Sequence, residues 1–501
     1  MKYVARSMVC RLVVGLCIGA GASLPIYAQD ADTTGVQEVD VRADLLEGAE
    51  EAGERIRRLI GNVRLQQEDT RLRARRAVQY PERREILFTG DVLVIERGDT
   101  LRADTVLYNS RDKTGHARGG ISLSDGDVLL EAPSGLYFTR SKRARFSEGV
   151  TLTDRAAVLT SLAGEYLSDE KRADFYGDVV LVEDNASLRA DTVTYHRETD
   201  ISLARGNVFV ERVDTTGQAD AKRQLVRSLL FGDRAYNEDS TGYSRMEGDP
   251  LLLRIREDST GADTDTLMVR ARVLESSRRD SLERLVAVDS VRILHGNLTA
   301  VADSVVYDRI TTVGEDGADI QRTTAWFFDN PLAWFQDNQV SGDTLQVEGS
   351  GEEAETLLVL GSAFAARPDS VTNRIHQLRG KRIEAAFEQD SLRTLSAGPQ
   401  AEAIHFRTGE DGSPEGAVHM SADQVLLHFL EGDIDRLEAI RDTEGVYYSE
   451  EILPDSLSLE GFVWRPERRP WKREFLQRVE WQGRNGFQPS GVPDPLPEPM
   501  D

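Results

Sequence analysis

The sequence predicts an all-β protein, an elongated folded-over sheet built from units of about 29 residues and followed by a second, less regular β part. Two observations predict this class. Apolar residues recur every 29 residues through the first half of the chain. Within each unit they alternate with the period of two that places side chains on one face of a strand. A fixed period of this length is typical of a repeat architecture.

The repeat keeps its register over six copies. One apolar position recurs as Val63, Val92, Ile121, Val150, Val179 and Val208. The sequence Leu-Arg-Ala-Asp-Thr-Val occurs at 101–106 and again at 188–193, three units later. Gly-Asp and Gly-Asn pairs at the joints favour turns. Leu101 and Tyr108 are an odd number of residues apart, so we expect a bulge between them, near Asp104.

A fully extended unit would run roughly 95 Å, so each unit must fold back into two or three strands of about six residues. Stacked units would then enclose a continuous apolar strip, which is either a filled core or an open groove for a ligand. The positions that we expect to line this strip are Val92, Val94, Leu101, Leu123, Leu130, Leu152, Val179, Leu181 and Leu188.

The N-terminus has the features of a secretory signal peptide. Basic residues precede a short apolar stretch, and Ala28 offers a small residue at the cleavage site. Both cysteines, Cys10 and Cys17, lie in this segment, so the exported chain would have neither a disulfide nor a cysteine-bound metal. The formal charge of −25 excludes nucleic acid as a bulk electrostatic partner.

We divide the chain where the pattern changes. The expected parts are a signal peptide at 1–28, a linker at 29–54, the regular repeats at 55–247, a second β part with loops at 248–470 and a proline-rich tail at 471–501.

No catalytic motif or metal site is predicted. The repeated Asp104 and Asp191, with Asp220 and Asp303, suggest gathered carboxylates. Other copies have Arg75, Pro133 or Leu162 at that position, which favours a turn or strand-end role. The seven histidines do not show metal-ligand spacing. We therefore expect neither a catalytic residue nor a cofactor.

One basic group contrasts with the acidic chain. Arg71, Arg73 and Arg75 alternate along a predicted strand, so their side chains should share a face, with Leu72 and Ala74 opposite. They fit either a charged edge strand that discourages aggregation or a contact with phosphate groups of a ligand.

The repeated unit resembles the OstA-like family, the periplasmic β-jellyroll proteins of lipopolysaccharide transport. The cleanest match is Gly177-Asp-Val-Val-Leu-Val182 with Leu188-Arg-Ala-Asp-Thr-Val-Thr-Tyr195, and Gly90 to Tyr108 is nearly as good. The segments at 57–65, 378–383, 427–437 and 461–470 resemble a larger, two-part variant of that family.

The resemblance implies a non-enzymatic, lipid-binding role in the periplasm, associated with the assembly of the outer membrane. The implied ligand is lipopolysaccharide or a related glycolipid, with its acyl chains in the apolar groove. The implied partners are other lipopolysaccharide-transport proteins, which pair through edge strands, and further copies of the chain in head-to-tail self-association. Two alternatives stay open from the residues alone: a structural or adhesive surface repeat, and a polysaccharide-cleaving β-solenoid enzyme.

Overall fold

The computed structural model describes residues 40–477, apart from short gaps at 68–69, 97–98, 125, 127, 154–156, 217–223, 258–263, 314–318, 351–352, 370–371, 389–390, 410–411, 431–432 and 455. The chain forms two compact units. Unit 1 comprises residues 1–212 and 234–240, and unit 2 comprises 213–233 and 241–501. The expected signal peptide lies outside the described residues.

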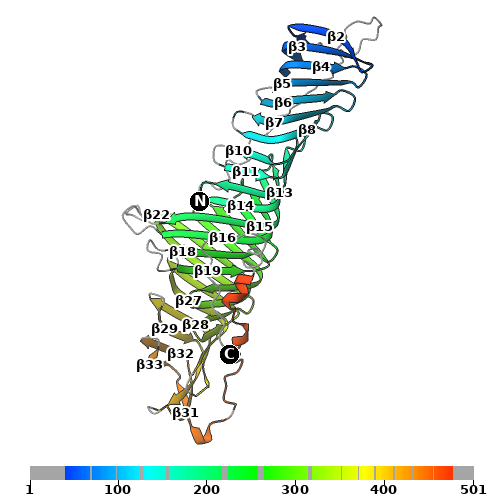
Figure 1. The fold of residues 1–501 in the computed structure, drawn as a ribbon. Helices are drawn as coiled ribbons and strands as arrows, with labels where there is room; N and C mark the ends of the chain where they lie inside the picture. Colours follow the sequence, from blue (N-terminus) through cyan, green and yellow to red (C-terminus); the bar gives the residue numbers. More distant parts are fainter. Residues whose placement is uncertain are drawn as a thin grey trace. The chain divides into compact units, whose positions relative to one another are not determined.

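Antiparallel strands dominate both units (Figure 1). The first fifteen are β1 (Asp40–Arg42), β2 (Leu45–Glu51), β3 (Glu54–Gln67), β4 (Thr70–Tyr80), β5 (Glu85–Glu96), β6 (Asp99–Asn109), β7 (Thr114–Ser124), β8 (Leu129–Phe138), β9 (Arg143–Ser147), β10 (Val150–Thr153), β11 (Ala157–Ser161), β12 (Ala163–Leu167), β13 (Arg172–Glu183), β14 (Ala186–His196) and β15 (Ile201–Thr216).

The remaining strands are β16 (Gln224–Glu238), β17 (Tyr243–Glu247), β18 (Leu251–Glu257), β19 (Thr264–Arg270), β20 (Val273–Arg279), β21 (Leu282–His295), β22 (Leu298–Val313), β23 (Asp319–Phe328), β24 (Leu332–Phe335), β25 (Asn338–Ser341), β26 (Thr344–Ser350), β27 (Glu353–Pro368), β28 (Ile375–Glu388), β29 (Ser391–Gly398), β30 (Ala401–Thr408), β31 (Pro414–Ala422), β32 (Gln424–Leu430), β33 (Asp433–Ile440) and β34 (Glu444–Ser449). Two 3₁₀ turns, Glu450–Ile452 and Pro466–Arg468, and a short helix at 472–477 follow.

In unit 1, one repeat of 29 residues is a pair of long strands. β5 has 12 residues and β6 has 11, in place of the two or three shorter strands that the length of the unit suggested. Each strand bends sharply at its middle and continues, because a bulge shifts the register there. In β5 and β6 the shift falls between Thr89 and Val92, opposite Asp104. The bulge expected near Asp104 is therefore present.

In β3, β5, β7, β13 and β15 the corner has a left-handed backbone conformation. At Gly206 and Asn207 the φ angles are +76° and +47°, both in the left-handed region. A Cβ atom on Gly206 would lie 2.0 Å from Asp191 Oδ2, so only glycine fits there. Asn207 Nδ2 donates to both carboxylate oxygens of Asp191 at 3.1 Å. The repeated Gly-Asn or Gly-Asp pairs thus fold the sheet over on itself.

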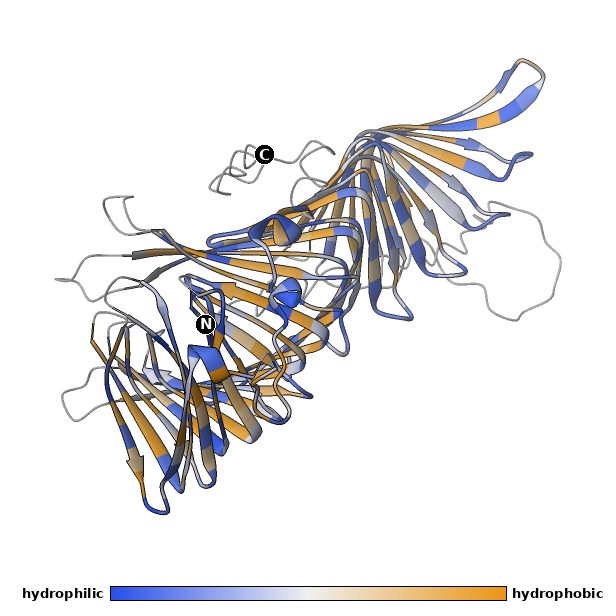
Figure 2. Ribbon diagram, turned by 90° about the horizontal axis from the view of Figure 1, so that it is seen from below, coloured by the Kyte–Doolittle hydropathy of each residue, from blue (hydrophilic) through white to orange (hydrophobic). Residues whose placement is uncertain are grey.

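The folded-over sheet of unit 1 has a dense interior. Side chains from both halves of the bent strands meet there: Val92 and Val94 from one half of β5, Phe88 from the other, all at most 4% exposed. Apolar and polar residues alternate along the strands (Figure 2). The predicted fold class, an all-β folded-over sheet, is confirmed.

In unit 2 the strands also bend, and the two halves pair with different neighbours, so the sheet has two arms. We call arm A the half in which β28 pairs with β29, and arm B the half in which β28 pairs with β30. Arm A continues through β32 to β33. Arm B continues through β31 to β34. β27 and β28 cross both arms.

The segment that follows β34 crosses the outer face of arm B. Gln339, which is 1% exposed, donates from Nε2 to the Val463 carbonyl (2.7 Å) and accepts from the Arg465 N–H (2.8 Å). Gln377 accepts from the Leu459 N–H at 2.8 Å. Each glutamine therefore fixes this segment through its backbone, as a strand partner would.

The structure differs from some of the expected domain boundaries. β1 and β2 lie within the segment expected to be a linker, and the helix at 472–477 lies at the start of the expected tail. The boundary at 247/248 falls within unit 2. No helix in the described part of the chain is long and apolar enough to cross a membrane.

Candidate functional site

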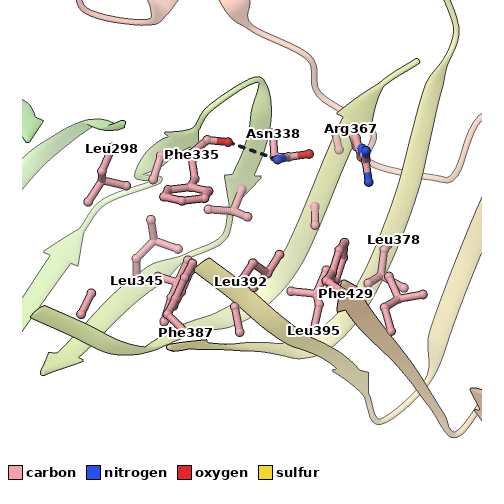
Figure 3. Close-up of a pocket in the computed structure, with 18 of the residues that line it drawn as sticks. Leu298, Phe335, Asn338, Leu345, Arg367, Leu378, Phe387, Leu392, Leu395 and Phe429 are labelled. Atoms are coloured by element: carbon pink, nitrogen blue, oxygen red, sulfur yellow. Dashed lines mark hydrogen bonds between the residues drawn. The ribbon is translucent and has the colours of Figure 1, made fainter. Parts of the chain in front are cut away.

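Unit 2 contains a cavity of about 940 Å³ between its two arms. This volume is near the upper end of the range for small-molecule sites. Leu345, Leu395 and Phe429 line it from arm A, and Leu298 and Leu378 from arm B (Figure 3). The lining is mostly apolar, so it can take up hydrocarbon but provides few groups for polar recognition.

The two arms meet at one end of this cavity. Phe335 of β24 and Phe387 of β28 come from opposite arms, and their rings lie edge to face with centroids 5.5 Å apart. Asn338 Nδ2 donates to the Phe335 carbonyl at 3.2 Å and holds the turn that carries this ring (Figure 3). The contact joins the two arms, and both rings line the cavity.

The charged and imidazole side chains that line the cavity come from arm B. They are Arg256, His295, Arg367, His376 and His405. Arg367 and His376 lie directly opposite each other on β27 and β28. Arm A contributes mainly leucine and phenylalanine, so the cavity has an apolar side and a side with hydrogen-bond donors. Such a division suits an amphiphilic ligand.

His376 and His405 form the centre of that donor group. Their rings stack with centroids 4.6 Å apart, and His376 Nδ1 accepts from the Phe406 N–H at 3.1 Å. Burial, with a smaller effect of His405, lowers the pKa of His376 to about 4. Burial also lowers the pKa of His405. At neutral pH His376 is therefore uncharged, and its proton is on Nε2, which leaves Nε2 as a donor.

The residues predicted for the apolar strip of unit 1 face its interior to different degrees. Val92, Val94, Leu101, Leu123, Leu130, Leu152 and Val179 are at most 7% exposed. Leu181 and Leu188 are only partly buried and lie directly opposite each other on β13 and β14. The strip is thus tightly packed at most of these positions and more open at this last pair.

The three predicted phosphate-contact arginines do not share one environment. Arg71 and Arg73 of β4 are exposed on the outer face, with Leu72 and Ala74 buried opposite. Arg75 lies at the corner of the strand and forms an ion pair with Asp91. The alternation that places Arg71 and Arg73 together therefore ends at the bulge.

The repeated aspartates occupy strand corners. Asp104 and Asp191 each lie over a corner glycine, and Asp303 lies at the register shift of β21 and β22. Asp220 is outside the described residues. Among those described, no group of three or more His, Cys, Asp or Glu side chains could hold a metal ion.

Sequence reasoning placed the ligand strip in unit 1 and missed the cavity of unit 2. The sequence contains only a weak signal for this cavity. The residues that line the cavity are spread over strands from β18 to β33, where the 29-residue register is lost. His376 and His405 are 29 residues apart, but two histidines at this spacing do not form a recognisable motif.

A folded-over antiparallel sheet with an apolar interior defines the class of the chain as an all-β protein. Residues 38–191 match the family model described as OstA-like protein. The resemblance predicted from the repeats is thus confirmed for this segment, which falls within unit 1.

A comparison with curated proteins finds no relative. Among the solved structures that match is LptH, the LptA-homologous periplasmic component of the conserved lipopolysaccharide transport device from Pseudomonas aeruginosa. The identity is 13%, over 34% of this chain and 83% of that one. The TM-score of 0.14 is too low to establish a shared overall fold.

Proposed function

We infer that this protein is an exported, periplasmic lipid-binding component of lipopolysaccharide transport and outer-membrane assembly. The observation that carries the proposal is the apolar cavity of about 940 Å³ between the arms of unit 2. Removing acyl chains from water would contribute about 0.8 kcal/mol for each buried CH₂ group. The OstA-like match over residues 38–191 supports the same role, which is non-catalytic.

The ligand would lie with its acyl chains against arm A and its polar part toward arm B. Phe387 and Leu392 would contact hydrocarbon. His376 Nε2 and the guanidinium of Arg367 would donate to oxygen atoms of a sugar or phosphate. The partly buried pair Leu181 and Leu188 in unit 1 is a second place where acyl chains could enter the interior.

Partners would bind through sheet edges. In the described pairings β1 and β2 have β3 as their neighbour, β33 has β32, and β34 has β31. Their free edges offer backbone N–H and C=O groups to a strand of another protein or of a second copy. We propose such pairing for other transport proteins and for head-to-tail self-association.

The test is site-specific photo-crosslinking of the full exported chain to purified lipopolysaccharide. A photoreactive phenylalanine at Phe387 should crosslink to lipid, and one at the exposed neighbour Glu384 should not. The same comparison in unit 1 uses Leu181 and Val182, which is 50% exposed on the opposite face.

Crosslinking at 387 but not 384 would support the proposal. Equal labelling at all four positions, or none while the protein is folded, would favour a structural or adhesive repeat. Mass spectrometry of lipid that co-purifies with the exported protein gives an independent result.

A further inference from the structure

The outer face of unit 1 has a row of arginines across neighbouring strands. Arg42 of β1 lies opposite Arg64 of β3, and Arg64 lies opposite Arg73 of β4. Beyond Arg73 the row continues through Leu93 to Arg102 of β6. Facing residues on antiparallel strands point to the same side, so these guanidinium groups share one surface.

Four arginines form what we call the arginine patch: Arg64, Arg71, Arg73 and Arg102, all exposed. Arg71 belongs to it because it is two residues before Arg73 on β4 and so points the same way. Within the part of the chain that the structure describes, none of the four has a side-chain hydrogen bond or ion pair. Arg42, at the edge, donates to Asp40 at 2.9 Å.

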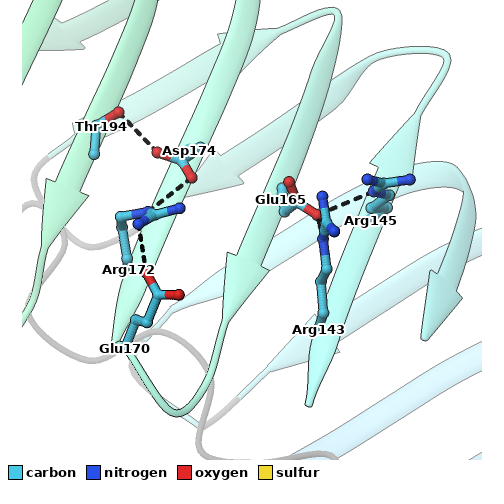
Figure 4. A network of polar contacts seen from close by, with 7 residues as sticks. All are labelled: Arg143, Arg145, Glu165, Glu170, Arg172, Asp174 and Thr194. Carbon is cyan, nitrogen blue, oxygen red and sulfur yellow. Dashed lines mark hydrogen bonds and ion pairs between the residues drawn. The ribbon is translucent and has the colours of Figure 1, made fainter. Parts of the chain in front are cut away.

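The outward side of the other half of the bent strands in unit 1 pairs its arginines with carboxylates. Arg145, Glu165, Asp174 and Thr194 form a comparable row across β9, β12, β13 and β14. Arg145 Nε lies 3.0 Å from Glu165 Oε1, and Thr194 Oγ1 donates to Asp174 Oδ1 at 2.7 Å (Figure 4). Like charges directly opposite one another destabilise a sheet, so the arginine patch costs stability that this second row avoids.

We propose that the arginine patch binds the phosphate groups of an anionic lipid surface. Guanidinium groups match phosphate oxygens in geometry and charge. The patch is exposed, and one exposed ion pair contributes little in water, so a single free phosphate would not be held. An array of phosphates in a lipid surface attracts all four arginines together. Each arginine then increases the partitioning of the protein onto the lipid surface about fivefold.

The negative charge of the whole chain does not prevent this contact. Neighbouring strands are about 4.8 Å apart, so the patch spans roughly 15 Å from β3 to β6. The Debye length at physiological ionic strength is about 8 Å, so distant carboxylates are screened from a surface that touches the patch. The local field is therefore set by the arginines.

Flotation of the full exported chain with lipid vesicles tests the proposal. The protein should bind vesicles of phosphatidylcholine with phosphatidylglycerol, lose binding at high ionic strength, and not bind phosphatidylcholine alone. Arg64→Gln with Arg73→Gln should weaken partitioning about 25-fold. The thermal midpoint of this variant should not fall, because two facing like charges are removed.

The matched control is Arg111→Gln with Arg140→Gln, which removes two exposed charges from turns of unit 1. It should lower partitioning by less than threefold. Equal losses in both variants, or wild-type partitioning of Arg64→Gln/Arg73→Gln, would overturn the proposal. Stronger competition by inorganic phosphate than by chloride at equal ionic strength would point to a small-anion site and would also overturn it. Failure to bind anionic vesicles would favour an acidic protein partner.

Discussion

Phe335 and Phe387 meet edge to face, 5.5 Å apart, although they belong to opposite arms of the unit 2 sheet. Such aromatic pairs contribute about 0.5–1.5 kcal/mol beyond the area they bury. A double-mutant cycle of Phe335→Leu and Phe387→Leu should therefore give a coupling free energy of about 1 kcal/mol in urea unfolding.

The control cycle combines Phe387→Leu with Phe364→Leu. Phe364 packs on the other face, against Phe462, so this pair should be additive. A coupling near zero for Phe335 and Phe387 would mean that the arms do not meet at these rings in solution.

The partly buried His376 predicts a pH dependence of stability. Its pKa in the folded protein is about 4, below the ordinary value of 6.5, so the unfolded chain binds the proton more readily. The contribution of the uncharged His376 imidazole to the free energy of unfolding is complete above about pH 6.5. This contribution is lost as the pH falls toward 4. The free energy of unfolding falls by at most about 3 kcal/mol. The actual fall is smaller than this limit because solvent screens the partly exposed ring.

His376→Asn keeps an acceptor for the Phe406 N–H but does not titrate. The free energy of unfolding of this variant should fall less between pH 7.5 and 4.5 than that of the wild type. Parallel pH profiles for the two proteins would show that His376 titrates normally in the folded state.

The corner glycines predict a position-specific cost of substitution. Gly206→Ala places a Cβ atom against Asp191, whereas Gly120→Ala, at nearly the same φ of +77°, meets open space. Both substitutions strain the backbone by about 1 kcal/mol or more. Gly206→Ala should lower the thermal midpoint further, and equal shifts would argue against the close Asp191 contact.

Substitutions of Val179 and Leu181 test how completely side chains fill the interior of unit 1. Val179 is 0% exposed, so Val179→Asp buries an unpaired charge and should prevent stable folding at neutral pH. Leu181 is only partly buried, so Leu181→Asp should leave a cooperative thermal transition. Circular dichroism distinguishes the two. A folded Val179→Asp protein would indicate an open groove at that position.

The sequence by itself determined the strand pattern and the bend of unit 1. Alternating valines and leucines can bury only one face of a strand, and Gly-Asn and Gly-Asp pairs can adopt the left-handed conformation of a corner at little steric cost. These are local properties, and the 29-residue period repeats them. The position of the bulge near Asp104 could be predicted for the same reason.

Only the tertiary structure decided where the cavity and the arginine patch lie. Arg42, Arg64 and Arg73 are neighbours because of strand register, which depends on contacts between residues about 10–20 positions apart in the chain. The lining of the unit 2 cavity brings together β18 and β33, and the segment after β34 is fixed by Gln339 and Gln377 from more than 80 residues earlier. Such long-range packing depends on how side chains fill space between the arms, and no local pattern encodes it.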